Sequence, residues 1–420
     1  MTSGAAKQQA GIAVIGGGVV GLATAVFAQR AGLQVTVYDP LPPGGGASFG
    51  NSGLISVDGC MPVSSPGMLR KVPGWLTDPL GPLAVKPGYF IKALPFLWRR
   101  VRAGAMSRVV ASSDGLRALH KPGLEQYREL LGSTGFRDLI RVAGAVQILE
   151  GDSAGKGERV ATVLWQRHGI MPESLGQDEL RQLIPEISPR VKRALLFPKN
   201  GHTVNPYRLV QKLAELLREA GGVVRQEQVL KIMPVSADEY RLITNTGDHR
   251  SGKIVVAGGA WSKRLLAPLG IALPLETERG YHVMIKNPSI ALRLPIMHRS
   301  RGFALVPMEG GLRLAGTVEI AGLEATLDER RADTIFRQGK ELLPQLAGED
   351  ISIWMGHRPS LPDSLPVIEE VPGRAGLFVA CGHGHTGVTA AAVTGRMITQ
   401  MILRQTPIVN PQPYRLARFH

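Results

Sequence analysis

The sequence is poor in cysteine and in aromatic residues, and rich in glycine. Cys60 and Cys381 are the two cysteines in 420 residues. Two thiols are too few for a disulfide framework or a four-thiolate zinc site, so a reducing compartment such as the cytoplasm fits best. Aromatic residues make up 5% of the chain, whereas glycine occurs 51 times without a collagen period. Such glycine usage indicates tight turns and close backbone approaches.

Long apolar runs and basic runs are also missing. Residues 11–28 are apolar and near the start, but glycines interrupt them and Lys7 is the only basic residue before them. This is typical of neither a signal peptide nor a spanning helix. The net charge is +15, from 49 basic and 34 acidic side chains, and the basic residues are scattered. Because no groove-reading motif accompanies that charge, we expect no nucleic-acid binding.

The N-terminus carries a complete strand–helix–strand unit. A buried strand is predicted at 12–15, a helix with apolar spacing ends near Gly32, and a second strand at 35–39 ends in Asp39. Between strand and helix lies a GxGxxG turn, GGGVVG, which contains Gly16, Gly18, Val19, Val20 and Gly21. Its glycines allow the tight turn, the approach of a pyrophosphate and close helix packing, while an acid at Asp39 suits ribose hydroxyls. The unit predicts a bound dinucleotide and leaves FAD and NAD open.

Two later segments repeat the pattern of strand, glycine turn and helix. A strand near 254–257 runs into Gly258, Ala260 and Trp261, and a strand at 377–381 runs into GHGHTG at 382–387 and a helix. The two histidines of the second turn are too few for a metal site, so we expect no metal. Covalent attachment of a cofactor to Cys381 lacks a matching context.

A helix is predicted across 90–102, despite Pro95, with Ile91, Leu94, Trp98 and Val101 on one face and basic residues around it. We favour a helix that covers a domain. The alternative is an element that lies at a membrane surface, which would allow peripheral contact at the inner face of the membrane.

Taken in order, five segments resemble the FAD-dependent amine oxidoreductases of the D-amino-acid oxidase superfamily. These are the first glycine turn, ASFGNSGLIS at 47–56, VVAGGAWS at 255–262, WMGHRP at 354–359 and GHGHTG at 382–387. Within the superfamily, the chain is most similar to the small subunit of bacterial D-amino-acid dehydrogenase. The resemblance covers nearly the whole chain.

The resemblance implies an α/β fold with two interleaved parts. A doubly wound, Rossmann-like FAD domain of the glutathione-reductase type would comprise 9–95, 197–265 and 358–407. An α+β substrate domain with an antiparallel sheet would comprise 96–196 and 266–357. FAD would be bound non-covalently.

The resemblance also assigns roles to residues. Arg358 would pair with the substrate carboxylate, and Tyr281 is a weaker candidate for the pocket wall. The first turn and Asp39 would hold the ADP half of FAD. The remaining cofactor contacts would be Ser48, Asn51, Gly53, Leu54, Gly258, Ala260, Trp261, Gly356, Gly382, His383, Gly384, His385, Thr386 and Gly387.

The implied activity is oxidative deamination of an amino acid, favouring a D-amino acid, with hydride transfer from Cα to flavin N5. The acceptor could be oxygen, a quinone or an electron-transfer partner. Two departures leave the side-chain preference open: Val388 replaces a usual tryptophan, and 59–67 lacks aromatic residues. Cyclic D-imino acid dehydrogenases of the D-proline or hydroxy-D-proline type and glycine or sarcosine oxidases are alternatives. An NAD-dependent enzyme and a basic surface-binding protein are rivals from other classes.

Overall fold

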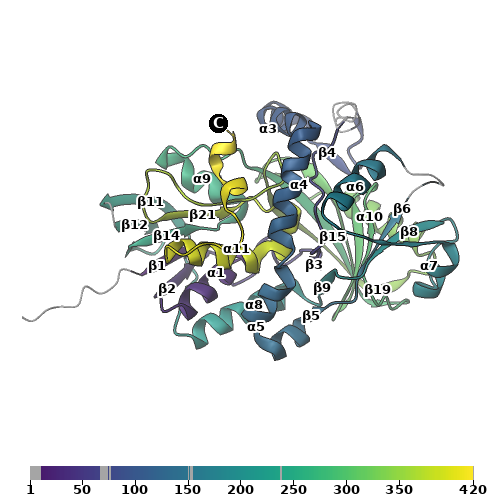
Figure 1. Cartoon of the computed structure of the whole chain (residues 1–420), viewed down its shortest axis with the longest axis horizontal. Helices are drawn as coiled ribbons and strands as arrows, with labels where there is room; N and C mark the ends of the chain where they lie inside the picture. Colours follow the sequence, from purple (N-terminus) through teal and green to yellow (C-terminus); the bar gives the residue numbers. More distant parts are fainter. Residues whose placement is uncertain are drawn as a thin grey trace, which may run out of the picture.

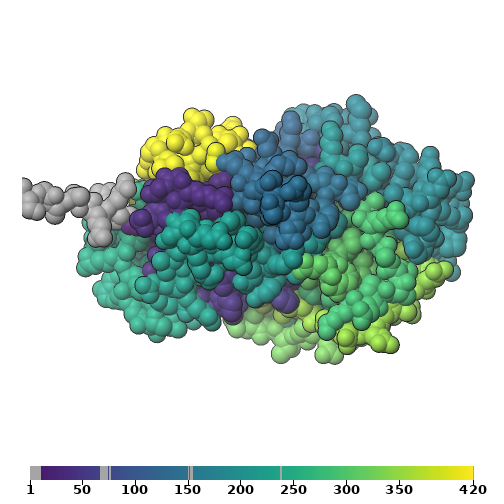
Figure 2. Space-filling view, turned by 90° about the horizontal axis from the view of Figure 1, so that it is seen from below, coloured from purple at the N-terminus to yellow at the C-terminus, as the bar shows by residue number. Residues whose placement is uncertain are grey.

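The computed structural model describes residues 11–66, 74, 77–149, 151, 155–236 and 239–419. Its elements form two lobes that share the chain in alternation (Figure 1). Figure 2 shows the same interleaving, with N-terminal residues in purple lying against teal and yellow segments from much later in the chain. The predicted α/β class with a doubly wound sheet and a second, mainly antiparallel sheet is confirmed.

The first lobe is built on a six-stranded sheet. Its order is β10 (Val223–Arg225), β2 (Val35–Tyr38), β1 (Ile12–Ile15), β14 (Lys253–Val256), β21 (Leu377–Cys381) and β20 (Val367–Glu370). All neighbours pair in parallel except β20, which runs antiparallel to β21. The central strands are short and apolar on both faces, as expected for a parallel sheet covered on each side.

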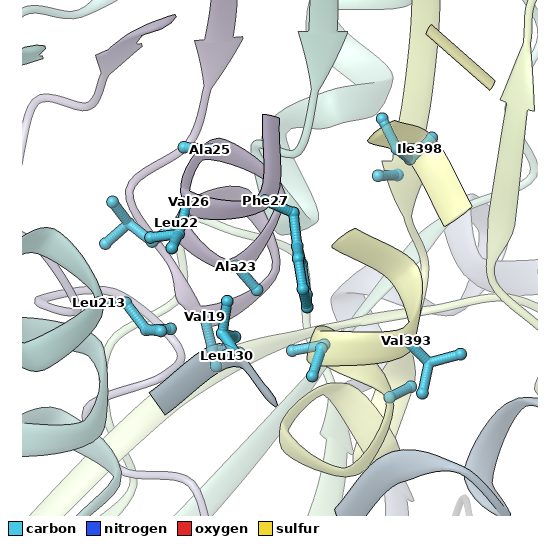
Figure 3. Close-up of a cluster of buried hydrophobic side chains, with 14 of the residues drawn as sticks. Val19, Leu22, Ala23, Ala25, Val26, Phe27, Leu130, Leu213, Val393 and Ile398 are labelled. Atoms are coloured by element: carbon cyan, nitrogen blue, oxygen red, sulfur yellow. The ribbon is translucent and has the colours of Figure 1, made fainter. Parts of the chain in front are cut away.

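Helices cover one face of this sheet. They are α1 (Val19–Arg30), α4 (Met106–His120), α5 (Gly123–Leu139), α8 (Pro206–Glu219) and α11 (Gly387–Ile402). Their side chains form one core cluster, part of which is drawn in Figure 3. Gly395 allows α11 to approach α1 closely, because a Cβ there would lie 2.7 Å from the backbone of Ala23. The other face is covered by a small antiparallel sheet of β11 (Val229–Ser236), β12 (Glu239–Thr244) and β13 (Asp248–Ser251).

The second lobe contains a nine-stranded mixed sheet. Its order is β19 (Gly348–Ser360), β15 (Glu276–Pro288), β18 (Gly311–Ile320), β17 (Phe303–Met308), β16 (Ile296–His298), β6 (Ala145–Leu149), β8 (Arg193–Phe197) and β7 (Glu173–Leu175), and β4 (Leu83–Val85) pairs with β18. Strands β17 and β18 form an antiparallel hairpin that turns at Glu309 and Gly310. Helices α10 (Glu329–Leu342) and α7 (Gln177–Leu183) bury their apolar faces in the core of this lobe, whereas α6 (Lys156–Arg167) packs in a smaller cluster.

Three short strands, β3 (Leu54–Ile55), β9 (Gly201–Thr203) and β5 (Ile140–Arg141), form a further small sheet. The contacts suggest different domain limits from those expected from sequence. Strand β4 belongs to the second sheet, and α4 and α5 pack in the core of the first lobe. We therefore propose that the substrate domain gains β4 and that the FAD domain gains α4 and α5.

Helix α3 (Phe90–Ala103) is turned opposite to its apolar pattern. It buries Ala93, Phe96, Leu97, Arg100 and Ala103, while Ile91, Leu94 and Trp98 are exposed by 82%, 49% and 59%. The helix does cover the second lobe, through a cluster that includes Val85 and Ile320. No helix in the described part of the chain is long and apolar enough to cross a membrane.

Candidate active site

The first glycine turn brings the start of α1 against the ends of β1 and β14. Gly16 has φ +120°, and a Cβ there would lie 2.3 Å from the carbonyl oxygen of Ala257. A Cβ on Gly21 would lie 1.9 Å from the carbonyl oxygen of Gly16. Ser48 caps the turn, because its Oγ accepts the N–H of Val19 at 3.0 Å. No acidic residue lies in the first turn of α1, so the helix N-terminus keeps its positive partial charge for an anion.

Asp39 follows β2 and holds this turn. Its Oδ2 accepts the N–H of Gly17 at 2.7 Å, and its Oδ1 accepts the N–H of Leu41 at 2.8 Å. Burial raises the pKa of Asp39, and these two hydrogen bonds act against the rise. The carboxylate is half-buried, so it also has room for a ligand.

The segment 48–54 is fixed by groups of both lobes. Asn51 accepts the N–H of Gly53 at 2.8 Å, and Gly53 has φ +76° with no room for a Cβ beside Thr203. From the second sheet, Arg313 donates to the carbonyl oxygen of Asn51 at 2.6 Å. Leu54 lies in β3, paired with β9. The loop is therefore preorganised.

The turn after β14 lies beside β19. Ala260 is buried and Gly258 is half-buried, while Trp261 is 41% exposed and contacts the edge of the His357 ring at 5.5 Å between centroids. Gly356 has no room for a Cβ because the ring of Trp354 lies over it. This packing shows why β19 needs a glycine at position 356.

The turn 382–387 separates its two histidines. Gly382 and Gly384 have φ +87° and +52°, which favour glycine. His383 is buried beneath α11, with its Nε2 2.9 Å from Thr394 Oγ1. His385 points the other way and is paired with Glu278 of β15. Thr386 hydrogen-bonds back to the carbonyl oxygen of His383 at 3.1 Å, and Gly387 begins α11. The described residues include no group of three or more His, Cys, Asp or Glu that could hold a metal ion.

Arg358 lies on β19 directly opposite Glu278 of β15. Its side chain extends over Gly280, where a Cβ would lie only 2.1 Å from the guanidinium carbon. It donates to the carbonyl oxygen of Thr317 at 2.8 Å. A register shift in the β15–β18 ladder and the positive φ of Thr317, 52°, mark a bulge at this carbonyl.

The guanidinium of Arg358 forms no ion pair with any carboxylate in the described ranges. Burial lowers its pKa to about 10, so it remains a cation at neutral pH. A half-buried arginine that lacks an anion is a ready binding site for a carboxylate, and its forked donors suit a bidentate pair.

Tyr281 is not brought to this site. Successive strand residues face opposite sides, so Tyr281 lies on the face of β15 away from Glu278 and Gly280. Its hydroxyl donates to Glu319 at 2.7 Å, and its side chain is 1% exposed in the core of the second lobe. Burial and Glu319 raise its pKa to about 12.

Two residues at the site were missed from the sequence. Glu278 and Arg100 form an ion pair, with side chains only 1% and 3% exposed. Glu278 lies two residues before Gly280, on the same face of β15. This spacing indicates a place in the site only when the register of β15 and β19 is known. In the sequence, nothing distinguishes Arg100 from the other basic residues of the helix predicted at 90–102.

The comparisons with known proteins agree with this geometry. Residues 11–401 match the family model described as DAO, FAD dependent oxidoreductase. The chain belongs to this family. A D-amino-acid oxidase of Bradyrhizobium diazoefficiens is 36% identical over 416 residues, covering 97% of this chain and 98% of the relative. The predicted superfamily, FAD requirement and oxidoreductase class are confirmed.

Solved structures share the fold of this DAO-family chain. Glycine oxidase from Geobacillus kaustophilus superposes with a TM-score of 0.73 at 22% identity, covering 98% of this chain and 99% of that one. L-proline dehydrogenase from P. horikoshii gives 0.73 at 18% identity, with 98% and 99% covered. The residues of the first glycine turn fit the cofactor, since they offer backbone N–H donors and space that only glycine leaves.

Proposed function

We propose that this enzyme oxidises an amino acid, with D-amino acids as the favoured class, to an imine that hydrolyses to a 2-oxo acid and ammonia. The observation that carries the proposal is Arg358, a cation without an anion beside the turn 382–387. Bound FAD supplies the acceptor for the hydride that leaves Cα. The protein would supply alignment: Arg358 binds the substrate carboxylate and thereby fixes where Cα lies.

The cofactor contacts are proposed residue by residue. The backbone N–H groups of Gly18 and Val20 would bind the pyrophosphate, Val19 would hold Ser48 beside it through its own N–H, and Asp39 would accept from the ribose. Other contacts would come from one loop, two later turns and strand β19. The 48–54 loop would contribute Ser48, Asn51, Gly53 and Leu54; the turn after β14 would contribute Gly258, Ala260 and Trp261; β19 would contribute Gly356; and the turn 382–387 would contribute Gly382, Gly384, the backbone of His385, Thr386 and Gly387.

His383 and Tyr281 are outside this proposal as direct contacts. The first is bonded to Thr394 beneath α11, and the second is bonded to Glu319 in the second core. His383 therefore supports the turn 382–387, and Tyr281 supports the pairing of β15 with β18.

The test is anaerobic bleaching of the flavin absorption band with a panel of D- and L-amino acids. The panel includes D-proline, hydroxy-D-proline, glycine and sarcosine. Rapid bleaching by linear D-amino acids supports the proposal, and bleaching only by cyclic or N-methyl substrates would replace that substrate class. Readmitting oxygen then reports the acceptor: fast recovery of colour indicates an oxidase, and slow recovery indicates a quinone or protein acceptor.

We further propose that the outer face of α3 rests on an anionic membrane surface. Its exposed apolar side chains, Ile91, Leu94 and Trp98, are accompanied by Lys92, Arg99 and Arg102. Apolar residues flanked by basic ones suit the headgroup region of an anionic bilayer. Such contact would bring the enzyme next to a membrane-soluble acceptor such as a quinone.

Co-sedimentation with vesicles tests this contact. We expect binding to vesicles that contain phosphatidylglycerol, weaker binding to pure phosphatidylcholine, and loss of binding in the Ile91→Ser/Trp98→Ser variant. Met171→Ser is the matched control, because Met171 is 87% exposed elsewhere on the surface. Vesicle binding that survives the double substitution contradicts the proposal, and so does a change in oligomeric state caused by that substitution in the absence of vesicles.

A further inference from the structure

Three ionisable side chains form a continuous chain from α3 to the turn that precedes α11. Arg100 is paired with Glu278 Oε1, and His385 Nε2 lies 2.9 Å from Glu278 Oε2. Arg100 precedes Glu278 in the sequence and His385 follows it, each at a distance of more than 100 residues. The chain therefore joins α3, β15 and the turn 382–387.

The hydrogen bond to Glu278 assigns the tautomer of His385. An ionised carboxylate only accepts hydrogen bonds, so the proton of the neutral ring is on Nε2. The other ring nitrogen, Nδ1, then carries a lone pair. Among the described residues, none donates a hydrogen bond to Nδ1. The side chain of His385 is 36% exposed, whereas that of Glu278 is 1% exposed.

The surrounding charges keep this ring neutral. The negative charge of Glu278 is already balanced by Arg100, whereas Arg358 on the neighbouring strand forms no ion pair with any carboxylate of the described residues. Burial, Arg358 and Arg100 lower the pKa of His385 well below its usual value. At neutral pH the ring is a hydrogen-bond acceptor at Nδ1 and a donor to Glu278.

We propose that His385 Nδ1 accepts a hydrogen bond from the amino group of the substrate, with Glu278 and Arg100 as positioning residues. This rests on the proposed function, because it requires the carboxylate on Arg358. Glu278 faces Arg358 across the strand pair and bonds His385, so the two substrate-binding groups share one neighbour. An α-amino acid carries its carboxylate and its amine on the same carbon atom, Cα, and the pair recognises both.

The experiment compares two inhibitors that differ only in an amino group, benzoate and 2-aminobenzoate. In the second, the carbon that bears nitrogen carries no hydrogen, so hydride transfer cannot occur. Dissociation constants are read from perturbation of the flavin absorption band. We expect His385→Leu to weaken 2-aminobenzoate by about 5- to 20-fold, the range for one hydrogen bond, and to leave benzoate within about twofold.

Two further variants separate positioning from packing. Glu278→Gln can donate to the ring, which favours the tautomer with a proton on Nδ1, so we expect selective loss of 2-aminobenzoate affinity with His385 intact. His385→Asn retains an acceptor near the Nδ1 position and should recover part of the affinity. A purely structural role would weaken both inhibitors equally.

The outcomes distinguish this inference from the proposed function. Equal losses for both inhibitors, or no loss in His385→Leu, overturn the role of His385 while Arg358 stands. If wild-type enzyme binds neither inhibitor and no amino acid bleaches its flavin, the proposed function fails and takes this inference with it. Should Glu278→Gln fail to fold, His385→Leu alone decides, since its side chain is partly exposed.

Discussion

Gly280→Ala should inactivate the enzyme without unfolding it. Gly280 lies on β15 beneath Arg358, and an added Cβ would lie 2.1 Å from the guanidinium carbon. Two carbon atoms in contact are normally about 3.5–4.0 Å apart, so the guanidinium must retreat by roughly 1.5 Å. A shift of that size breaks its 2.8 Å hydrogen bond to the Thr317 carbonyl oxygen. It also moves the proposed carboxylate site.

The expected cost falls on catalysis. Misplacing a bound substrate by about 1 Å costs roughly 100-fold in rate, so we expect kcat/KM to fall by about that factor. The cost in stability should be small. Gly280 does not have a left-handed φ, and alanine in a strand gains about 0.5–1 kcal/mol over glycine. That gain offsets part of the lost hydrogen bond, which is worth about 1.5–3 kcal/mol for a charged donor.

The assay pairs steady-state kinetics with benzoate affinity and the urea unfolding midpoint. Gly310→Ala is the matched control, because Gly310 lies in the hairpin turn of the same sheet and the nearest atom to its added Cβ is 3.6 Å away. Gly280→Ala enzyme that keeps benzoate affinity and turnover within twofold of wild type would show that Arg358 does not bind the carboxylate.

Three other outcomes follow from the same structure. Arg358→Ala should keep the yellow colour of bound flavin and lose more than about 100-fold in kcat/KM. Arg358→Lys should restore little of that activity, since an ammonium cannot form a bidentate pair with the carboxylate. Near-normal turnover of Arg358→Ala would refute the assignment of Arg358 to the substrate carboxylate. Gly21→Ala should yield colourless protein, because its Cβ would lie 1.9 Å from the carbonyl oxygen of Gly16, while Gly88→Ala, with no atom within 4 Å, should stay yellow. Acid should destabilise the fold, because burial lowers the pKa values of four buried histidines to about 3 or 4, namely His120, His202, His282 and His383. Their neutral forms stabilise the fold fully above about pH 6.5, and each loses about 2 kcal/mol of that contribution by pH 5; a urea midpoint unchanged between pH 7.5 and pH 5 would contradict this.

The nucleotide end of the fold is readable from sequence because its signals are local. The strand, the glycine turn, the helix and Asp39 all fall within about 30 residues, the length typical of such a unit. Gly16 is required by its contact with Ala257, and Gly21 by its contact with the carbonyl oxygen of Gly16. Helix α8 likewise begins at a local sequence signal, since Asn205 caps its first turn by accepting the N–H of Arg208 at 3.0 Å.

The second lobe is less readable because its site depends on strand register. Moving one residue along β15 changes the face, which separates Tyr281 from Glu278 and Gly280. An apolar or aromatic residue in such a strand gives no indication of which face it occupies. The same problem arises in the turn 382–387, where His383 and His385 are two residues apart and point to different partners.

Helix α3 shows how a distant partner overrides local pattern. Its strongest apolar residues, Ile91, Leu94 and Trp98, are exposed, while the charged Arg100 is buried against Glu278. A buried ion pair is rarely the most stabilising choice, because apolar residues of similar volume avoid its desolvation cost. Stability alone therefore does not explain why this helix buries an arginine. The proposed role of His385 would explain it, since a Glu278 without Arg100 would favour a charged ring, and a charged ring has no lone pair to accept a hydrogen bond from the substrate amine.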